Sequence, residues 1–339
     1  MVDSKTRFCI VGCGRIGRRH AEIIIKNYRL AAVCDILQDR AAHFGAEFNC
    51  RHYSDFEQML KKEKADVLVV CTPNYLHAVH SIAGMGAGLH VLCEKPMAIS
   101  VEDALSMKSV SLATGRKLHI VKQNRFNPPV VFLNKLLSCG SLGKISSFHL
   151  NGFWNRDISY YENCWHSAKA TDGGMLYTQF SHFIDIMIWM LGSPENISGM
   201  SGNFLHEGVA DYEDTAVFSV RLPGGTLGGL HFTVNSYRRN MEGSLTVFGE
   251  KGTIKIGGPY LNKLEFMEVE GLENVVLDAG NPPNDYGSYK GSMSNHPEVY
   301  KNFVENIHSR NNHANDHEVA FETVKVIARM YEALNHKSS

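Results

Sequence analysis

Short apolar runs alternate with segments of helical periodicity over the first 120 residues. Runs that are apolar throughout are typical of parallel strands covered by helices on both faces. The pattern therefore predicts a doubly wound α/β domain. The predicted strands are Arg7–Val11, Leu30–Cys34, Asp66–Cys71, His90–Cys93 and Lys117–Val121. The predicted helices are Ile16–Asn27, Asp39–Phe44, Leu76–Met85 and Val101–Thr114.

The pattern changes after Val121, and a second, α+β domain of residues 124–339 is predicted to follow a first domain of residues 1–123. Helices are expected at Pro128–Ser138, Gly174–Leu191, His296–His308 and Glu318–Asn335. Strands are expected at Lys144–Phe153, Thr215–Leu222, Thr226–Asn235, Gly243–Phe248 and Thr253–Ile256. The segment Asn281–Asn295 is rich in Pro, Asn, Gly and Ser, which favours a mobile loop.

Composition narrows the class of protein. The chain has 34 Lys and Arg residues against 35 Asp and Glu residues, and this balance argues against a nucleic-acid partner, which would need a basic excess. No apolar run approaches the ~20 residues of a membrane span, and no secretory leader precedes the first strand, so we expect a cytoplasmic chain. None of the eight cysteines forms a Cys-x-x-Cys pair. They are interpreted as buried hydrophobes, and no metal site is expected.

A glycine-rich turn indicates the first candidate chemistry. Gly12, Gly14 and Gly17 form a G-x-G-x-x-G motif directly after the first strand and at the start of the first helix. Such a turn lets backbone amides and a helix N-terminus approach a pyrophosphate. Asp35 ends the second strand, where a carboxylate binds ribose hydroxyls and repels a 2′-phosphate. The motif favours NAD, although Arg40 nearby leaves NADP as an alternative.

Two further strand ends carry unusual residues. Thr72-Pro73-Asn74 precedes His77, and Glu94-Lys95-Pro96 follows the fourth strand. Ligands of such sheets bind at the carboxyl ends of the strands, although both segments are also ordinary turn chemistry. Lys95 lies where a nicotinamide is expected, and the cationic ring would lower its pKa.

These three motifs, in this order and spacing, resemble the glucose–fructose oxidoreductase/inositol dehydrogenase/rhizopine-catabolism (Gfo/Idh/MocA) family. The resemblance implies a Rossmann domain, an open-sheet domain and a homodimer or homotetramer formed through that sheet. It implies Lys95 and His182 as catalytic residues, with Asp185 at the family's His-x-x-Asp spacing. The cofactor-binding residues that it implies are Gly12, Cys13, Gly14, Arg15, Ile16, Asp35, Thr72, Asn74, His77, Glu94, Lys95 and Gln123.

A narrower resemblance spans residues 122–130, 154–161 and 165–174. These segments are similar to the UDP-N-acetylglucosaminuronate 3-dehydrogenases of bacterial surface-polysaccharide pathways. Such enzymes oxidise the C3 hydroxyl of the sugar to a ketone before transamination. The chain departs from this subgroup at His166, Thr178 and Phe180, where the subgroup has Arg, Asn and Gly.

Oxidation of a secondary alcohol needs one base and one group that stabilises the oxygen. His182 has the better-suited pKa for the base, and Lys95 would stabilise negative charge, although the two roles can be reversed. A nucleotide sugar requires arginine forks and aromatic faces. The predicted substrate-binding residues are Lys95, Arg125, Arg156, Tyr160, Tyr161, Trp165, Thr178, Gln179 and His182, with Tyr237, Arg238 and Arg239 as weaker candidates.

Alternatives remain open at this point. The aromatic side chains can equally be core and the arginines solvated. An inositol or free-sugar dehydrogenase of the same family would need fewer phosphate partners. A regulatory protein that binds NAD without catalysis is a further alternative, although the presence of both Lys95 and His182 argues against it.

Overall fold

The computed structural model describes residues 6–162, 164–285, 290–308 and 316–335, and the chain divides into two compact units. The first unit comprises residues 1–121 and 296–324, and the second comprises residues 122–295 and 325–339. The expected boundary after residue 123 lies close to the observed one. The expected second domain differs because helix α11 (His296–His308) belongs to the first unit, where Tyr300 packs on Phe8 with ring centroids 5.5 Å apart.

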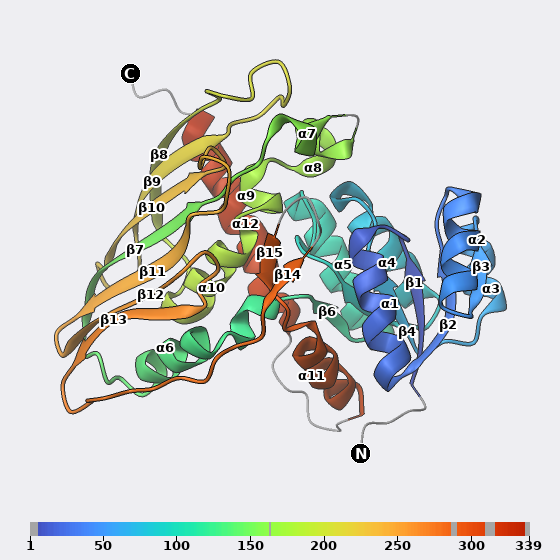
Figure 1. Ribbon diagram of the computed structural model, residues 1–339, viewed down its shortest axis with the longest axis horizontal. Coiled ribbons are helices and arrows are strands. Elements are labelled where there is room, and N and C mark those ends of the chain that lie inside the picture. Colours follow the sequence, from blue (N-terminus) through green and yellow to red (C-terminus); the bar gives the residue numbers. More distant parts are fainter. Residues whose placement is uncertain (1–5, 163, 286–289, 309–315, 336–339) are drawn as a thin grey trace. The chain divides into compact units, whose positions relative to one another are not determined.

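The first unit is built on a parallel sheet with the strand order β3-β2-β1-β4-β5-β6 (Figure 1). Every residue of β4 is buried, which requires helices on both faces and explains the continuous apolar run in the sequence. This is the predicted doubly wound α/β fold. The strands are β1 (Arg7–Val11), β2 (Arg29–Cys34), β3 (Arg51–Tyr53), β4 (Val67–Val70), β5 (His90–Cys93) and β6 (Leu118–Ile120).

The strand order reverses at β1, which pairs with β2 on one side and β4 on the other. Val11 is in register with Val70, and Val70 is in register with Cys93. The three strands therefore end at the same edge, and the turns that leave them begin at Gly12, Cys71 and Glu94. Such a reversal is where ligands bind in open α/β sheets.

The helices that connect these strands have recognisable ends. Ser100 caps α5 by accepting a hydrogen bond of 3.1 Å from the Asp103 amide, and Gly115 ends the helix in the left-handed conformation. Strand β3 and helix α3 were not predicted from the sequence. The helices are α1 (Arg15–Asn27), α2 (Gln38–Glu47), α3 (Phe56–Lys62), α4 (His77–Gly86), α5 (Val101–Thr114) and the first part of α12 (Asp316–Asn335), with a 3₁₀ turn η1 (Asn74–Leu76).

The second unit contains a mixed sheet with the order β13-β12-β11-β7-β10-β9-β8. Its central strands β7 and β10 are parallel, and the other pairs are antiparallel. Residues of β9 alternate between buried and exposed, so one face of the sheet forms the core. The strands are β7 (Ile145–Phe153), β8 (Asn196–Gly202), β9 (Thr215–Arg221), β10 (Leu227–Thr233), β11 (Glu242–Gly249), β12 (Gly252–Gly257) and β13 (Lys263–Val269).

Helices α6 and α10 cover the core face of this sheet (Figure 1). The predicted helix Gly174–Leu191 is wrong in one respect, because it is interrupted between α9 and α10. The ring of Phe180 stacks on Phe232 at 4.9 Å and occupies the space that Gly152 leaves open. The helical segments are α6 (Pro128–Ser138), α7 (Ile158–Tyr161), α8 (Lys169–Asp172), α9 (Met175–Thr178) and α10 (Ser181–Leu191), with 3₁₀ turns η2 (Gln123–Phe126) and η3 (Trp165–Ser167).

The segment Asn281–Asn295, expected to be a mobile loop, contains regular structure in its described part. Strands β14 (Pro283–Asp285) and β15 (Lys290–Met293) pair in antiparallel fashion. The segment is rich in turn-forming residues, so its composition did not predict this small sheet. Across the described ranges of the chain, no helix has both the length and the apolar character needed to cross a bilayer.

Candidate active site

The glycine-rich turn after β1 leaves open space at the start of α1. A side chain at Gly12, where φ is +97°, would come within 2.5 Å of the Cys71 carbonyl oxygen, and one at Gly17 would come within 2.1 Å of the Gly12 oxygen. No heavy atom lies within 4 Å of the position that a side chain at Gly14 would take. Gly14 is the N-cap of α1, whose first turn contains the predicted cofactor residues Arg15 and Ile16. The turn therefore fits a pyrophosphate at the helix N-terminus.

Asp35 directly follows β2 and contacts the same turn. Its Oδ2 accepts a hydrogen bond of 2.9 Å from the Cys13 amide, and its Oδ1 accepts one of 3.0 Å from the Leu37 amide. These bonds fix a carboxylate beside the glycine turn, where it can bind a ribose diol. Arg40 lies 3.5 Å from the carboxylate, but half of its side chain is exposed.

His77 connects the turns that follow β4 and β5. Its Nε2 lies 2.9 Å from the Thr72 carbonyl oxygen and its Nδ1 lies 2.7 Å from the Pro96 carbonyl oxygen. His77 and Asn74 are both buried. The predicted cofactor residues of these turns are thus brought to one sheet edge, and His77 is buried in a bridging position. Their direct contact with a cofactor stays a prediction.

Lys95 follows β5 and is partly exposed, whereas Glu94 before it is buried. The Lys95 amide donates a hydrogen bond of 3.1 Å to Glu94 Oε2, so the carboxylate is directed into the protein. Glu94 is therefore held by groups of its own unit, and its predicted contact with a cofactor stays a prediction.

His182, the predicted base, lies in the second unit. It lies in the first turn of α10, is buried, and has its Nε2 3.3 Å from the Gln123 side-chain nitrogen. An amide can accept from an N–H or donate to a nitrogen lone pair, so Gln123 can orient the imidazole in either protonation state. Gln123, predicted as a cofactor residue, thus contacts the predicted base.

One turn further along α10, Asp185 forms a buried ion cluster with Arg125 and Lys122. Its carboxylate accepts two hydrogen bonds of 2.8 Å from Arg125 and lies 3.0 Å from Lys122 Nζ. Burial alone would raise the pKa of Asp185, but Arg125 and Lys122 outweigh it and hold the pKa well below its ordinary value. The Arg125 guanidinium also lies over Trp189 at 5.0 Å. These contacts give Arg125 a structural role, and its predicted contact with substrate stays a prediction.

Aromatic rings and an arginine gather around Tyr160. Its ring stacks on His166 with centroids 4.4 Å apart, and the Arg156 guanidinium lies 5.2 Å from its centroid. Gln179 donates a hydrogen bond of 3.2 Å to the Tyr160 hydroxyl, and Trp165 packs on His166 at 3.8 Å. Four of the predicted substrate residues are therefore adjacent: Arg156, Tyr160, Trp165 and Gln179.

Asp172 supports this aromatic cluster and was not among the predicted site residues. It is fully buried, lies 2.7 Å from His166 Nδ1, and accepts a hydrogen bond of 2.6 Å from the Thr178 hydroxyl. Burial raises the pKa of Asp172 despite these partners. Thr178 therefore contacts Asp172, and Tyr161 is fully buried and packs on His206. The predicted contacts of both residues with substrate stay predictions.

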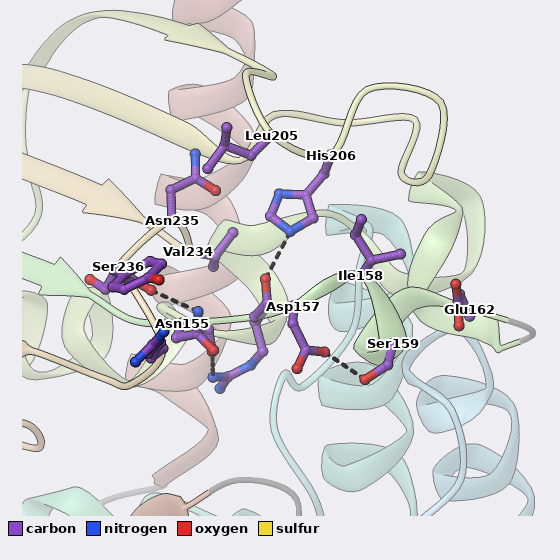
Figure 2. Close-up of a pocket in the computed structure, with 13 residues that line it drawn as sticks. Asn155, Asp157, Ile158, Ser159, Glu162, Leu205, His206, Val234, Asn235 and Ser236 are labelled. Atoms are coloured by element: carbon purple, nitrogen blue, oxygen red, sulfur yellow. Dashed lines mark hydrogen bonds between the residues drawn. The ribbon is translucent and has the colours of Figure 1, made fainter.

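A cleft of 530 Å³ opens beside this cluster at the end of β10 (Figure 2). Figure 2 shows Asp157 and Ser159 on one wall and Asn235 and Ser236 on another. His206, also absent from the predicted residues, has its Nε2 2.8 Å from the main-chain carbonyl oxygen of residue 156 and so fixes the wall. The cleft brings together three candidate substrate residues, Arg156, Tyr237 and Arg238.

The fold and the glycine turn define an oxidoreductase that binds a dinucleotide. Residues 6–121 match the family model described as "Oxidoreductase family, NAD-binding Rossmann fold", and residues 130–255 match the GFO/IDH/MocA C-terminal domain. The chain therefore belongs to the Gfo/Idh/MocA oxidoreductase family, as the sequence motifs predicted. It is an NAD-dependent enzyme that acts on hydroxyl groups of sugars or polyols, which confirms the predicted enzyme class and cofactor.

Known proteins differ in how much of the chain they resemble. The WlbA dehydrogenase from Bordetella pertussis, solved with NADH and UDP-GlcNAcA, is 29% identical with a TM-score of 0.87, covering 97% of this chain and 96% of that one. The 2,7-anhydro-N-acetylneuraminate hydratase of Escherichia coli is 29% identical over 73% of this chain and 66% of its own length. Inositol 2-dehydrogenase 2 of Saccharopolyspora erythraea is 27% identical over 84% of this chain and 82% of its own.

Proposed function

We propose that this protein oxidises the C3 hydroxyl of a UDP-linked N-acetylamino uronate, such as UDP-N-acetylglucosaminuronate, to the 3-keto sugar. The observation that carries this proposal is the likeness to WlbA, which extends over nearly the full length of both chains. Inositol and free-sugar dehydrogenases of the family are the competing class. The 3-keto product suits a later transamination in surface-polysaccharide synthesis.

The cleft of the second unit supports a nucleotide sugar over a free polyol. A UDP sugar carries a diphosphate and a flat uracil, and the uronate adds a carboxylate. Arg156 and Arg238 suit the anionic groups, and Tyr237 offers an aromatic face. The cleft volume of 530 Å³ is within the range of ~300–1,000 Å³ that is usual for small-molecule sites. Because Asp157 and Glu162 also line the cleft, we expect the phosphates on its arginine side.

The catalytic residues divide the proton chemistry between them. Bound NAD, held by the turn at Gly12 and Gly14 and by Asp35, supplies the hydride acceptor. His182 takes the hydroxyl proton, and Gln123 keeps its ring in one orientation. Lys95 hydrogen-bonds the same oxygen and stabilises the charge that develops as the proton leaves.

The assay that tests this proposal follows NADH absorbance with UDP-N-acetylglucosaminuronate beside glucose and inositol. A keto acid is included as a second acceptor, since tightly bound cofactor hides turnover. Turnover of UDP-N-acetylglucosaminuronate and not of the free sugars is expected. Turnover of free polyols alone would overturn the substrate, and NAD binding without turnover of any sugar would revive the regulatory alternative. Mass spectrometry of the product separates oxidation from the addition of water.

Two neighbouring arginines provide a matched test of the cleft. Both side chains are exposed, but Arg238 lines the cleft and Arg239 does not. We expect Arg238→Ala to weaken UDP binding by about tenfold, as loss of an interaction worth ~1.4 kcal/mol would do, and Arg239→Ala to change it by less than about twofold. Equal losses in the two variants would indicate general electrostatic attraction and would remove the cleft from the proposal.

We also propose that the chain forms a homodimer or homotetramer through the mixed sheet of its second unit, on the face opposite to the core. Apolar side chains on this face are exposed and share its orientation, since cross-strand partners point the same way. Met200 is in register with Val217, and Phe248 and Leu227 are both in register with Ser147. An apolar surface of this kind is typical of an interface.

A further inference from the structure

Three buried side chains from separate elements of the first unit meet beside the main chain of Lys95. His20 comes from α1, Glu94 follows β5, and His296 is the first residue of α11. Nε2 of His20 lies 2.9 Å from Glu94 Oε1, and Nε2 of His296 lies 3.5 Å from the same oxygen. All three are within the buried interior of their unit. The proposed chemistry uses none of these contacts, so the cluster needs its own explanation.

The hydrogen bonds of the cluster run in one direction. The Tyr300 hydroxyl lies 2.7 Å from His20 Nδ1 and can donate to it, which leaves the Nε2–H of His20 to donate to Glu94. The other carboxylate oxygen accepts the Lys95 amide at 3.1 Å. Glu94 therefore links the main chain of Lys95 to His20 in α1 and, through the hydrogen bond of His20 with Tyr300, to α11.

The negative charge of Glu94 determines which groups it can bind. Burial alone would raise the pKa of Glu94, but the hydrogen bond from His20 and the nearby imidazole of His296 hold it well below its ordinary value. The carboxylate thus stays ionised and acts only as an acceptor. A buried carboxylate costs free energy that an apolar residue would not, so its presence is better explained by the orientation that it imposes on its donors.

A second contact holds the other side of the turn. The Pro96 carbonyl oxygen lies 2.7 Å from His77 Nδ1, and His77 belongs to α4. The residues before and after Lys95 are therefore both anchored to buried side chains. Its side chain projects from a fixed peptide.

Resting on the proposed role of Lys95, we propose that His20, Glu94 and His296 are positioning residues for its ammonium group. They act through the Lys95 main chain and do not contact substrate. An error of ~1 Å in the placement of a catalytic group costs on the order of a hundredfold in rate. Loss of the cluster should therefore lower kcat more than it raises KM.

Two histidines and a glutamate are also a known zinc ligand set. The direct hydrogen bond of 2.9 Å between His20 and Glu94 uses the ring nitrogen that would face a metal. Positioning by hydrogen bonds is the inference that this geometry favours. Bound metal becomes one outcome of the test.

The test compares Glu94→Gln and His20→Asn with a control at the opposite end of β5. His90 begins that strand, is partly buried, and accepts a hydrogen bond of 2.9 Å from the Lys117 amide. We expect kcat to fall about tenfold or more in the two cluster variants, with KM changed by less than about threefold. His90→Gln should retain wild-type kcat. Equal losses in all three variants would reduce the cluster to a general stabilising role and overturn the proposal.

A double-mutant cycle with Lys95→Ala gives the decisive result. If Glu94 acts through Lys95, Glu94→Gln should have little further effect once Lys95 is removed. Multiplying effects would overturn the proposal, as would stoichiometric zinc that disappears in His296→Gln. If Lys95→Ala leaves kcat unchanged, the proposed role of Lys95 fails instead. Should Glu94→Gln not fold, His296→Gln enters the same cycle.

Discussion

His182 is the residue whose removal tests the proposed chemistry most directly. Its Nε2 faces Gln123 at 3.3 Å, and its ring is not part of the glycine turn that is expected to bind the cofactor. We expect His182→Asn to lower kcat by ~10² or more, the usual contribution of a general base, with the Kd for NAD unchanged. Stopped-flow measurement of NADH formation and fluorescence titration with NADH check the two parts. An unchanged rate would remove His182 from the mechanism.

The buried ion pairs of Asp185 are expected to contribute to the free energy of unfolding. Asp185→Asn would leave Lys122 and Arg125 buried without their counter-ion, and removing one partner of a buried ion pair costs ~3–5 kcal/mol. We expect a fall of that size in the free energy of unfolding, measured by urea denaturation at neutral pH. The exposed pair of Lys61 and Glu57 provides the control, and Glu57→Gln should cost less than ~1 kcal/mol. Similar losses in the two variants would contradict a special role for the buried cluster.

The same carboxylate predicts a pH dependence. The pKa of Asp185 is lowered in the folded protein, so its stabilising contribution is complete above the ordinary pKa of an aspartate, ~3.9. That contribution is lost as the pH falls below this value toward the lowered pKa. Unfolding free energies of the wild type and Asp185→Asn should therefore differ by a constant amount between about pH 5 and 7 and converge in stronger acid. A difference that already shrinks near about pH 6 would contradict the assignment.

Residues of the site differ in how far they could be predicted. Gly14 at the start of α1 and Asp35 directly after β2 belong to one strand–helix–strand unit, so local spacing was enough to predict them. Arg125 was expected to bind an anionic substrate, but it donates two hydrogen bonds to Asp185, which lies 60 residues away in the chain. No local pattern indicates a pairing over that separation. The same holds for His20, whose partner His296 comes from the far end of the sequence.

At the scale of elements, substitutions at two glycines of the turn before α1 should affect different properties, one NAD binding and the other stability. Gly14→Ala adds a methyl group in open space, where we expect a pyrophosphate, so NAD affinity should fall about tenfold while the melting temperature stays unchanged. Gly17→Ala meets the main chain of Gly12 and should lower the melting temperature instead. Gly86→Ala, also in open space but in α4, is the control for both measurements. Loss of NAD affinity in Gly86→Ala would show that the assay reports stability alone.

Two of the elements that were not predicted from the sequence, β3 and β8, have weak hydrophobic patterns. Strand β3 has two exposed residues of three, and β8 contains glycine and serine at most of its positions. Both are held by pairing with a neighbouring strand, β2 and β9 respectively, and a sequence pattern does not show such pairing. Strand β4 was predictable because all its residues are apolar and buried, and helix α5 was predictable because Ser100 and Gly115 mark its ends.

At the scale of the whole molecule, the exposed face of the mixed sheet in the second unit predicts self-association. Val217 lies on this face beside Met200, and a symmetric dimer contains each substitution twice. Val217→Lys would place two charges in the interface, so we expect the dimer Kd to rise at least about a hundredfold. Val276, exposed in the same unit but outside the strands, is the matched control, and Val276→Lys should leave assembly unchanged. Light scattering after size-exclusion chromatography measures both variants, and a Val217→Lys protein that stays assembled would exclude this face as the interface.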